Sequence, residues 1–185
     1  MRNSYFSSHK VQMLVEGAVM VALAFTLSMV AGFRMPQGGS VTAGSMLPIV
    51  LFAVRWGWKL GLFVGLTFAL VQLTVSTIWF VNIPQFMFDY ILPFMLLGMA
   101  GVFFRKKWGM IAGAALGGFL RFLSHFIAGI AFWGQYAPAD QGPWLYSLLY
   151  NGTYMLPEIM FAAGVAAMLA RPLERVVTGH DLWEI

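Results

Sequence analysis

The most informative residues of this chain are an arginine, a histidine and a tryptophan that lie at regular intervals along one apolar segment. They are Arg121, His125 and Trp133, and Gly129 occupies the remaining position of the same four-residue spacing. On an α-helix this spacing keeps all four positions within about 120° of one face. Ionisable side chains are costly against hydrocarbon, so the stripe is predicted to face the interior of a helix bundle. It would hold a polar ligand or supply structural hydrogen bonds, and Gly129 leaves room for a ligand or a neighbouring helix.

A carboxylate and a phenol, Asp89 and Tyr90, interrupt a second apolar run. One interpretation makes Asp89 the buried partner of Arg121, in an ion pair that serves structure. The other makes it a carboxylate that faces a cationic or hydrogen-bond-donating ligand. The two interpretations are compatible, because a ligand can compete for the carboxylate.

Aromatic side chains gather around one polar loop. Trp133, Trp144, Tyr146 and Tyr150 flank it, and aromatic residues at a membrane boundary are common without any ligand. Their faces also bind flat rings and cations. Asn151 adds a donor and an acceptor that suit the edge of a heterocycle. Because Tyr146 and Asn151 are about 140° apart on an ideal helix, they converge only if Tyr146 lies before the helix or in a distorted first turn.

Two glutamates and several missing motifs limit the remaining chemistry. Glu16 lies near the end of its segment and is interpreted as structural, and Glu158 is expected to form a buried hydrogen bond. The chain has no G-x-x-x-x-G-K phosphate loop and no H-E-x-x-H motif. Ser124 and His125 are adjacent, so on a helix they point about 100° apart, a poor geometry for a nucleophile and its base. We therefore do not expect an enzyme, and no metal or cofactor is expected.

The elements that carry these residues are predicted to be membrane helices. Sixty per cent of the 185 residues are hydrophobic and 10% are charged, whereas a soluble domain is about a quarter charged. A spanning helix takes about 20 residues, so the whole chain is needed for one bundle. We predict an all-α integral membrane protein in which residues 1–185 form a single membrane domain of six transmembrane helices. The predicted helices cover about 11–33, 43–55, 60–80, 84–104, 109–133 and 145–170.

The basic residues predict the orientation of this bundle. They lie before the first segment, between the second and third, between the fourth and fifth, and after the sixth, and the opposite loops carry only Arg34. By the positive-inside rule, both termini are cytoplasmic, and the Gly- and Pro-rich loops 34–42 and 134–144 lie outside. The basic residues lie between apolar runs and form no basic face. We therefore expect the protein to lie in a lipid bilayer and to bind no nucleic acid.

Small residues at intervals of four predict close helix packing. Two glycine series have this spacing, and Ala18 and Ala22 form a smaller version in the first segment. Such positions let helix backbones approach closely, and we interpret both glycine series as internal packing. The series are Gly57, Gly61 and Gly65, and Gly109, Gly113 and Gly117.

Taken together, these stretches resemble the thiamin-specific substrate-binding S-components of energy-coupling-factor (ECF) vitamin transporters, the ThiT/YuaJ family. The similarity extends over nearly the whole chain, and its last block is long and irregular, which makes it specific. The matching stretches are MPQGGSVT at 35–42, DY at 89–90, RxxxHxxxG at 121–129, the block 135–157, and AxxxALA at 18–24.

The resemblance implies a six-helix bundle in the bacterial cytoplasmic membrane that binds thiamin near its outer face. It implies ligand contacts from Asp89, His125, Tyr146 and Asn151, with Tyr90, Arg121, Gly129 and Trp133 as further lining. Some family members carry Glu and Lys where this chain has Asp89 and Arg121, which keeps the charges but changes their reach. Some also place a Trp over the ligand from the loop that corresponds to 34–42, where this chain has none.

The resemblance also implies partners that supply energy. S-components dock on a membrane T-component that carries two ATPases, and the face of Ala18 and Ala22 would be the docking surface. Two alternatives stay open. One is an S-component for another vitamin or a thiamin precursor, and the other is a membrane enzyme that uses His125 and Asp89 as acid and base.

Overall fold

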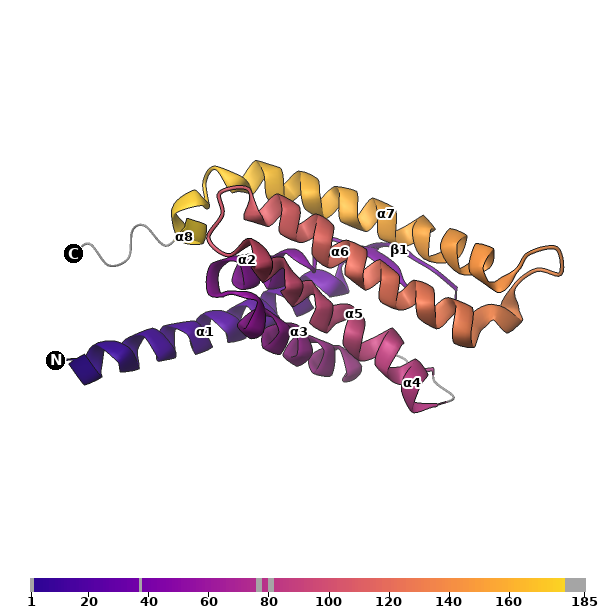
Figure 1. The fold of residues 1–185 in the computed structure, drawn as a ribbon, viewed down its shortest axis with the longest axis horizontal. Coiled ribbons are helices and arrows are strands. Elements are labelled where there is room, and N and C mark those ends of the chain that lie inside the picture. The colour runs from indigo at the N-terminus through magenta and orange to yellow at the C-terminus, as the bar shows by residue number, and fades with distance from the viewer. Residues whose placement is uncertain (1, 37, 76–77, 80–81, 179–185) are drawn as a thin grey trace.

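The computed structural model describes residues 2–36, 38–75, 78–79 and 82–178, with side chains from residue 9 onward. Helices dominate, many of them elongated in a similar direction, and one short two-stranded sheet lies among them (Figure 1). The start of the first helix and the last helix, Glu174–Thr178, lie toward the same end of the molecule (Figure 1). The elements are α1 (Arg2–Met29), β1 (Ala31–Arg34), β2 (Ser40–Thr42), α2 (Leu47–Trp56), α3 (Trp58–Leu73), α4 (Ile83–Phe86), η1 (Met87–Ile91), α5 (Leu92–Met95), η2 (Leu96–Phe103), α6 (Gly109–Ala128), η3 (Gly129–Trp133), η4 (Gly134–Tyr136), α7 (Pro143–Ala170) and α8 (Glu174–Thr178).

Several short elements join into long apolar runs. α4, η1, α5 and η2 follow one another without a break, as do α6, η3 and η4. Among the described residues, four runs are suited by length and composition to cross a membrane, and each belongs to one of the predicted segments. α2 and α3 are shorter apolar helices. The four runs are His9–Met29, Ile83–Phe103, Gly109–Tyr136 and Pro143–Ala170.

The all-helical prediction is wrong for the segment after α1. The helix predicted to reach residue 33 ends at Met29, and β1 pairs antiparallel with β2. Gly38 and Gly39 adopt φ angles of +94° and +87° in the connection, a region that glycine enters without steric cost. Hydropathy alone does not distinguish a short apolar strand from the last turn of a helix. The third predicted helix also ends early, at Leu73, and part of its predicted remainder lies outside the described residues.

Glycines bring three helical runs into backbone contact, which confirms the predicted internal packing. A Cβ atom on Gly61 would lie 2.7 Å from the carbonyl oxygen of Gly98, and one on Gly65 would lie 2.5 Å from that of Phe94. On α6, a Cβ on Gly117 would lie 3.2 Å from the backbone of Leu97. Gly57 has another task, because its φ of +93° forms the break between α2 and α3.

Substituting alanine for Gly98 is expected to destabilise the bundle strongly. The added methyl would sit 2.1 Å from the carbonyl carbon of Gly61, where backbone and not a flexible side chain must move. We expect a loss of about 3 kcal/mol or more in the free energy of unfolding, measured by thermal unfolding in detergent. The matched control is Gly164→Ala on α7, where nothing lies within 4 Å of the new Cβ. Equal unfolding temperatures for the two variants would contradict this packing.

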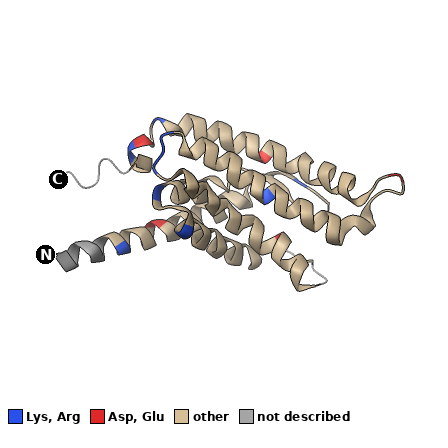
Figure 2. Cartoon of the chain, viewed as in Figure 1, with Lys and Arg blue, Asp and Glu red and all other residues tan. Residues whose placement is uncertain are grey.

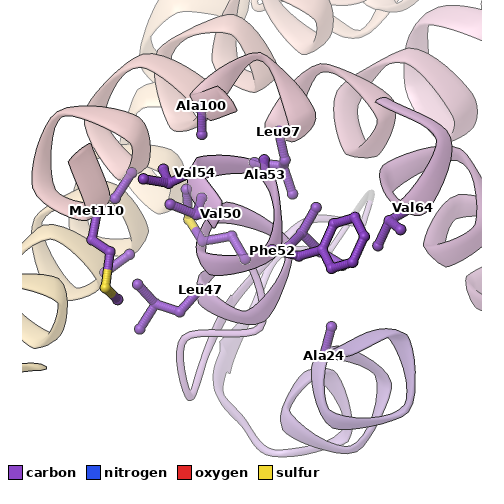
Figure 3. Close-up of a cluster of buried hydrophobic side chains, with 14 of the residues drawn as sticks. Ala24, Leu47, Val50, Phe52, Ala53, Val54, Val64, Leu97, Ala100 and Met110 are labelled. Atoms are coloured by element: carbon purple, nitrogen blue, oxygen red, sulfur yellow. The ribbon is translucent and has the colours of Figure 1, made fainter. Parts of the chain in front are cut away.

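The hydrophobic core is centred on α2 (Figure 3). Phe52, Ala53 and Val54 are buried there against Leu97 of η2 and neighbouring helices. Almost the whole circumference of α2 is buried, because α1, α3, η2, α6 and α8 all pack against it. A helix enclosed in this way needs neither the length nor the lipid-facing surface of a peripheral span.

Most of the lysines and arginines lie toward the end of the molecule that carries both termini (Figure 2). At this end Arg55 forms an ion pair with Glu16 of α1 at 2.9 Å and donates a hydrogen bond to the backbone oxygen of Val176 in α8. The structural role predicted for Glu16 is therefore confirmed. Nearby, Lys107 and Glu174 pair at 2.7 Å, and this contact lowers the pKa of the Glu174 carboxyl and raises that of the Lys107 ammonium.

Candidate functional site

A cavity of about 440 Å³ lies among the β1–β2 hairpin, η1, α6, η3 and α7. This volume falls in the range of small-molecule sites. All eight residues predicted for the site line this one cavity, although they come from four different elements. They are Asp89, Tyr90, Arg121, His125, Gly129, Trp133, Tyr146 and Asn151.

The carboxylate of Asp89 is contacted by two other residues predicted for the site, Trp133 and His125. The indole Nε1 of Trp133 donates a hydrogen bond to its Oδ2 at 2.8 Å, and Nδ1 of His125 lies 3.6 Å from its Oδ1. Asp89 lies in η1 and Trp133 in η3, and both segments are π-helical. π-Helical turns are rare in proteins, and those that do occur are often found at functional sites. The predicted stripe on one helix is thus completed by a carboxylate from another.

Of the two interpretations of Asp89, the ion pair with Arg121 is wrong. Arg121 pairs instead with Glu158 of α7, with Nη1 at 3.8 Å from Oε1, and its guanidinium lies 5.0 Å from the ring centre of Phe94. Arg121 is only 5% exposed, and its Nε and Nη1 donate no hydrogen bond to the protein. Which carboxylate faces Arg121 depends on how α6 packs against α7, and no local pattern in the sequence contains that information.

Glu158 confirms the expectation of a buried hydrogen bond. Its side chain is fully buried, and Oε1 accepts a hydrogen bond from the hydroxyl of Thr42 at 2.6 Å. The backbone N–H of Thr42 donates to Oε2 of the same carboxylate. Ser45 completes the cluster, with its hydroxyl 2.8 Å from that of Thr42.

The amide of Asn151 is engaged within the protein at both ends. Nδ2 donates to the backbone oxygens of Ser147 at 3.0 Å and His125 at 3.3 Å, and Oδ1 accepts from the hydroxyl of Tyr154 at 2.9 Å. Tyr146 lies in the first turn of α7. Tyr146 and Asn151 both line the cavity. Since the N–H of Tyr146 donates to the carbonyl oxygen of Gly142 at 3.1 Å, as in an ordinary helical turn, the distortion expected for this turn is absent and the two side chains line the cavity from a regular helix. Asn151 thus ties α6 to α7 beside the cavity.

Gly129 allows a close approach between η3 and α7. A Cβ atom there would lie 2.1 Å from the hydroxyl oxygen of Ser147. Of the two uses foreseen for this glycine, the structure therefore demonstrates the helix contact. Tyr90 is held in place by its hydroxyl, which accepts a hydrogen bond from the backbone N–H of Trp79 at 2.8 Å.

The β1–β2 hairpin forms the wall of the cavity on the side where some family members carry a tryptophan and this chain has none. Met35, Gly38 and Gly39 line the cavity from this side together with Arg34. The hydroxyl of Tyr150 donates to the backbone oxygen of Gly38 at 2.9 Å, which fastens the hairpin to α7.

Several lining residues were missed by the sequence analysis. Tyr154 follows Tyr146 and Tyr150 at the same four-residue spacing, and this aromatic stripe was a usable signal. Ser28, Gln72 and Thr42 gave none, because each reaches the cavity through tertiary packing; Ser28 and Gln72 also share a hydrogen bond at 3.2 Å. Trp144, one of the flanking aromatic residues, is 58% exposed and is not part of the lining.

The charges of the cavity differ between its two sides. Arg121 and Glu158 neutralise each other formally, whereas Trp133 gives Asp89 a hydrogen bond without charge. His125 and four tyrosines line the same space. Among the described residues, no group of three or more His, Asp or Glu side chains is arranged to hold a metal ion. The arrangement suits a flat, polar organic molecule with a positive charge near Asp89.

The profile of the family described as "Thiamine transporter protein (Thia_YuaJ)" matches residues 14–178. The chain belongs to this family. The thiamine transporter ThiT of Bacillus subtilis (strain 168) is 36% identical over 179 residues, which cover 89% of this chain and 93% of the relative. ThiT of Lacticaseibacillus paracasei is 28% identical over 184 residues and 91% of each chain.

A solved structure of ThiT from Listeria monocytogenes has the same fold. It superposes with a TM-score of 0.78 and covers 91% of this chain and 98% of its own, at 24% sequence identity. The match supports the helical architecture. Together with the family membership, the four apolar runs found among the described residues identify a helical membrane protein.

Proposed function

We propose that this protein is the thiamin-binding S-component of an ECF-type importer. The observation that carries the proposal is the Asp89 carboxylate in a cavity walled by Trp133, His125 and tyrosines. Thiamin joins a flat aminopyrimidine to a cationic thiazolium, and both parts suit such a space. Family membership and the names of the relatives support the same ligand.

Within this proposal the side chains have separate tasks. Asp89 neutralises the cation or accepts from the aminopyrimidine, and Trp133 stacks on a ring. Tyr146 supplies a hydrogen bond from the first turn of α7. Asn151 acts on the ligand only through a lone pair that its protein contacts leave free. Its larger contribution is to hold α6 and α7 at the spacing that the ligand requires.

The proposed topology has both termini in the cytoplasm and the cavity toward the outer face. It is supported by the basic residues gathered at the end of the termini (Figure 2). The cavity is formed by the hairpin, η1, η3 and the start of α7, which lie away from that end (Figure 1). Thiamin would then enter from outside, as import requires.

The proposed energy source is a T-component with two ATPases, since the chain has no phosphate-loop motif of its own. The proposed docking surface on α1 contains Ala18 and Ala22. Both residues are exposed, and large apolar neighbours such as Val15 and Val19 are exposed beside them. Small side chains allow a partner helix to approach closely.

Calorimetric titration of the purified protein with thiamin tests this function. We expect one thiamin per chain with a dissociation constant below about 1 µM, without ATP and without partner subunits. Competition with thiamin phosphates, the free pyrimidine and unrelated vitamins separates thiamin from the alternative vitamin or precursor. Chemical turnover of thiamin by the protein alone would favour the membrane enzyme, and absence of thiamin binding would refute the proposal.

A further inference from the structure

One buried carboxylate connects the wall of the cavity to its arginine. Glu158 is fully buried half way along α7, and one of its oxygens, Oε1, is 2.6 Å from the Thr42 hydroxyl and 3.8 Å from Nη1 of Arg121. Thr42 ends β2, and Arg121 lies on α6. A single side chain thus contacts two residues that lie 116 and 37 positions earlier in the chain.

The requirements of Arg121 make this contact consequential. A buried guanidinium is stable only with a compensating charge or several hydrogen bonds. Glu158 is its ion-pair partner, and the 3.8 Å separation is too long for a hydrogen bond. Nε and Nη1 are therefore left without protein acceptors at the cavity wall. A shift of the Glu158 carboxylate would therefore also shift the guanidinium of Arg121.

The hairpin depends on α7 in the same region. Thr42 donates to Glu158 through both its N–H and its hydroxyl. Tyr150, two turns earlier on α7, donates to Gly38. Gly39 lies so close to Tyr154 that an added Cβ would be 2.8 Å from its ring. Of these attachments, only the one to Glu158 is charged, and it is the one that also reaches Arg121.

We propose that Glu158 is a positioning residue that couples the β1–β2 hairpin to Arg121, so that the closed hairpin and the placement of the guanidinium form one structural unit. Glu158 itself does not touch the ligand in this scheme. The consequence for ligand binding rests on the proposed function. The effect on the hairpin does not, and it can be measured without any ligand.

The hairpin is tested by distance measurements between spin labels. The chain has no cysteine, so Phe33→Cys on β1 and Leu156→Cys on α7, both exposed, give clean label sites. Glu158→Gln removes the charge and places an amide NH2 group, itself a donor, against the donor groups of Thr42 and Arg121. We expect it to broaden the label distance distribution or shift it by several ångströms. Thr42→Val, which removes only the hydroxyl, should act in the same direction but less.

Two matched controls separate coupling from general damage. Thr153→Val removes an exposed hydroxyl on α7 that bonds only within its own helix, and Glu174→Gln neutralises an exposed carboxylate on α8. Neither should change the distance distribution. An unchanged distribution in a folded Glu158→Gln protein would overturn the inference whether or not the protein binds thiamin.

A double-mutant cycle on thiamin affinity tests the second half of the coupling. Thr42→Val and Arg121→Met are combined, since each removes one contact of Glu158. We expect the combined change in affinity to differ from the product of the single changes by more than about threefold, which exceeds the scatter of independent sites. In the Glu158→Gln background this deviation should disappear. Simple multiplication in the wild-type background would refute the coupling, because it is the behaviour of sites that do not act through a shared partner.

Discussion

Replacing Asp89 by asparagine is expected to weaken thiamin binding by about a hundredfold or more. Asparagine keeps the size of the side chain and an acceptor for the Trp133 indole, but it removes the negative charge from the side of the cavity where Trp133 and His125 contact the carboxylate. Truncating one member of a desolvated charge pair costs about 2–5 kcal/mol. The measurement is the dissociation constant from calorimetry, with the folded state checked by thermal unfolding.

The control for this substitution is another aspartate of the same charge. Asp140→Asn alters an exposed residue in the loop between η4 and α7, outside the cavity lining. Its affinity should equal that of the unmodified protein. If Asp89→Asn also binds thiamin with unaltered affinity while remaining folded, Asp89 does not neutralise the ligand and the proposed site loses its central residue.

Placing tryptophan at Ala18 or Ala22 is expected to abolish thiamin uptake while sparing thiamin binding. Both positions face outward on α1 and do not line the cavity, so the larger ring would obstruct a partner helix without disturbing the ligand. Uptake of labelled thiamin in cells that contain the T-component and ATPases gives the first measurement. The dissociation constant of the purified variant gives the second.

Phe119→Trp is the matched control for this docking surface, because Phe119 is exposed on α6, far from α1 in the sequence. It should preserve both uptake and binding. Parallel loss of uptake and binding in the α1 variants would indicate misfolding, and full uptake in both would show that the docking surface lies elsewhere on the molecule.

Much of the site was predictable because its residues obey helix periodicity. Arg121, His125, Gly129 and Trp133 form one stripe, and their polarity in an apolar run requires an interior position. The stripe and Asp89 do line one cavity. The glycine series also obey helix periodicity, and they predicted close helix contacts because a glycine has no side chain to keep two backbones apart.

Other features depended on contacts between distant segments. Asp89 and Glu158 were both available carboxylates for Arg121, and only the packing of α6 against α7 selects Glu158. Asn151 lines the cavity as expected, but its hydrogen bonds between α6 and α7 could not be predicted. The hairpin was not predicted, because the hydropathy of β1 also fits the end of a helix and β2 lies in a stretch whose composition indicates a loop.

By itself, the amino-acid sequence determined the chemical class of this protein: an apolar chain with basic residues at alternate boundaries and a few ionisable groups kept inside. These properties are local, because they follow from residue type and helical spacing. Tertiary structure alone decided which charges meet, how the hairpin closes the cavity, and that Glu158 joins the two. Pairing energies act through space, and the partners of Glu158 lie on β2 and α6, at a distance along the chain that no periodic pattern encodes.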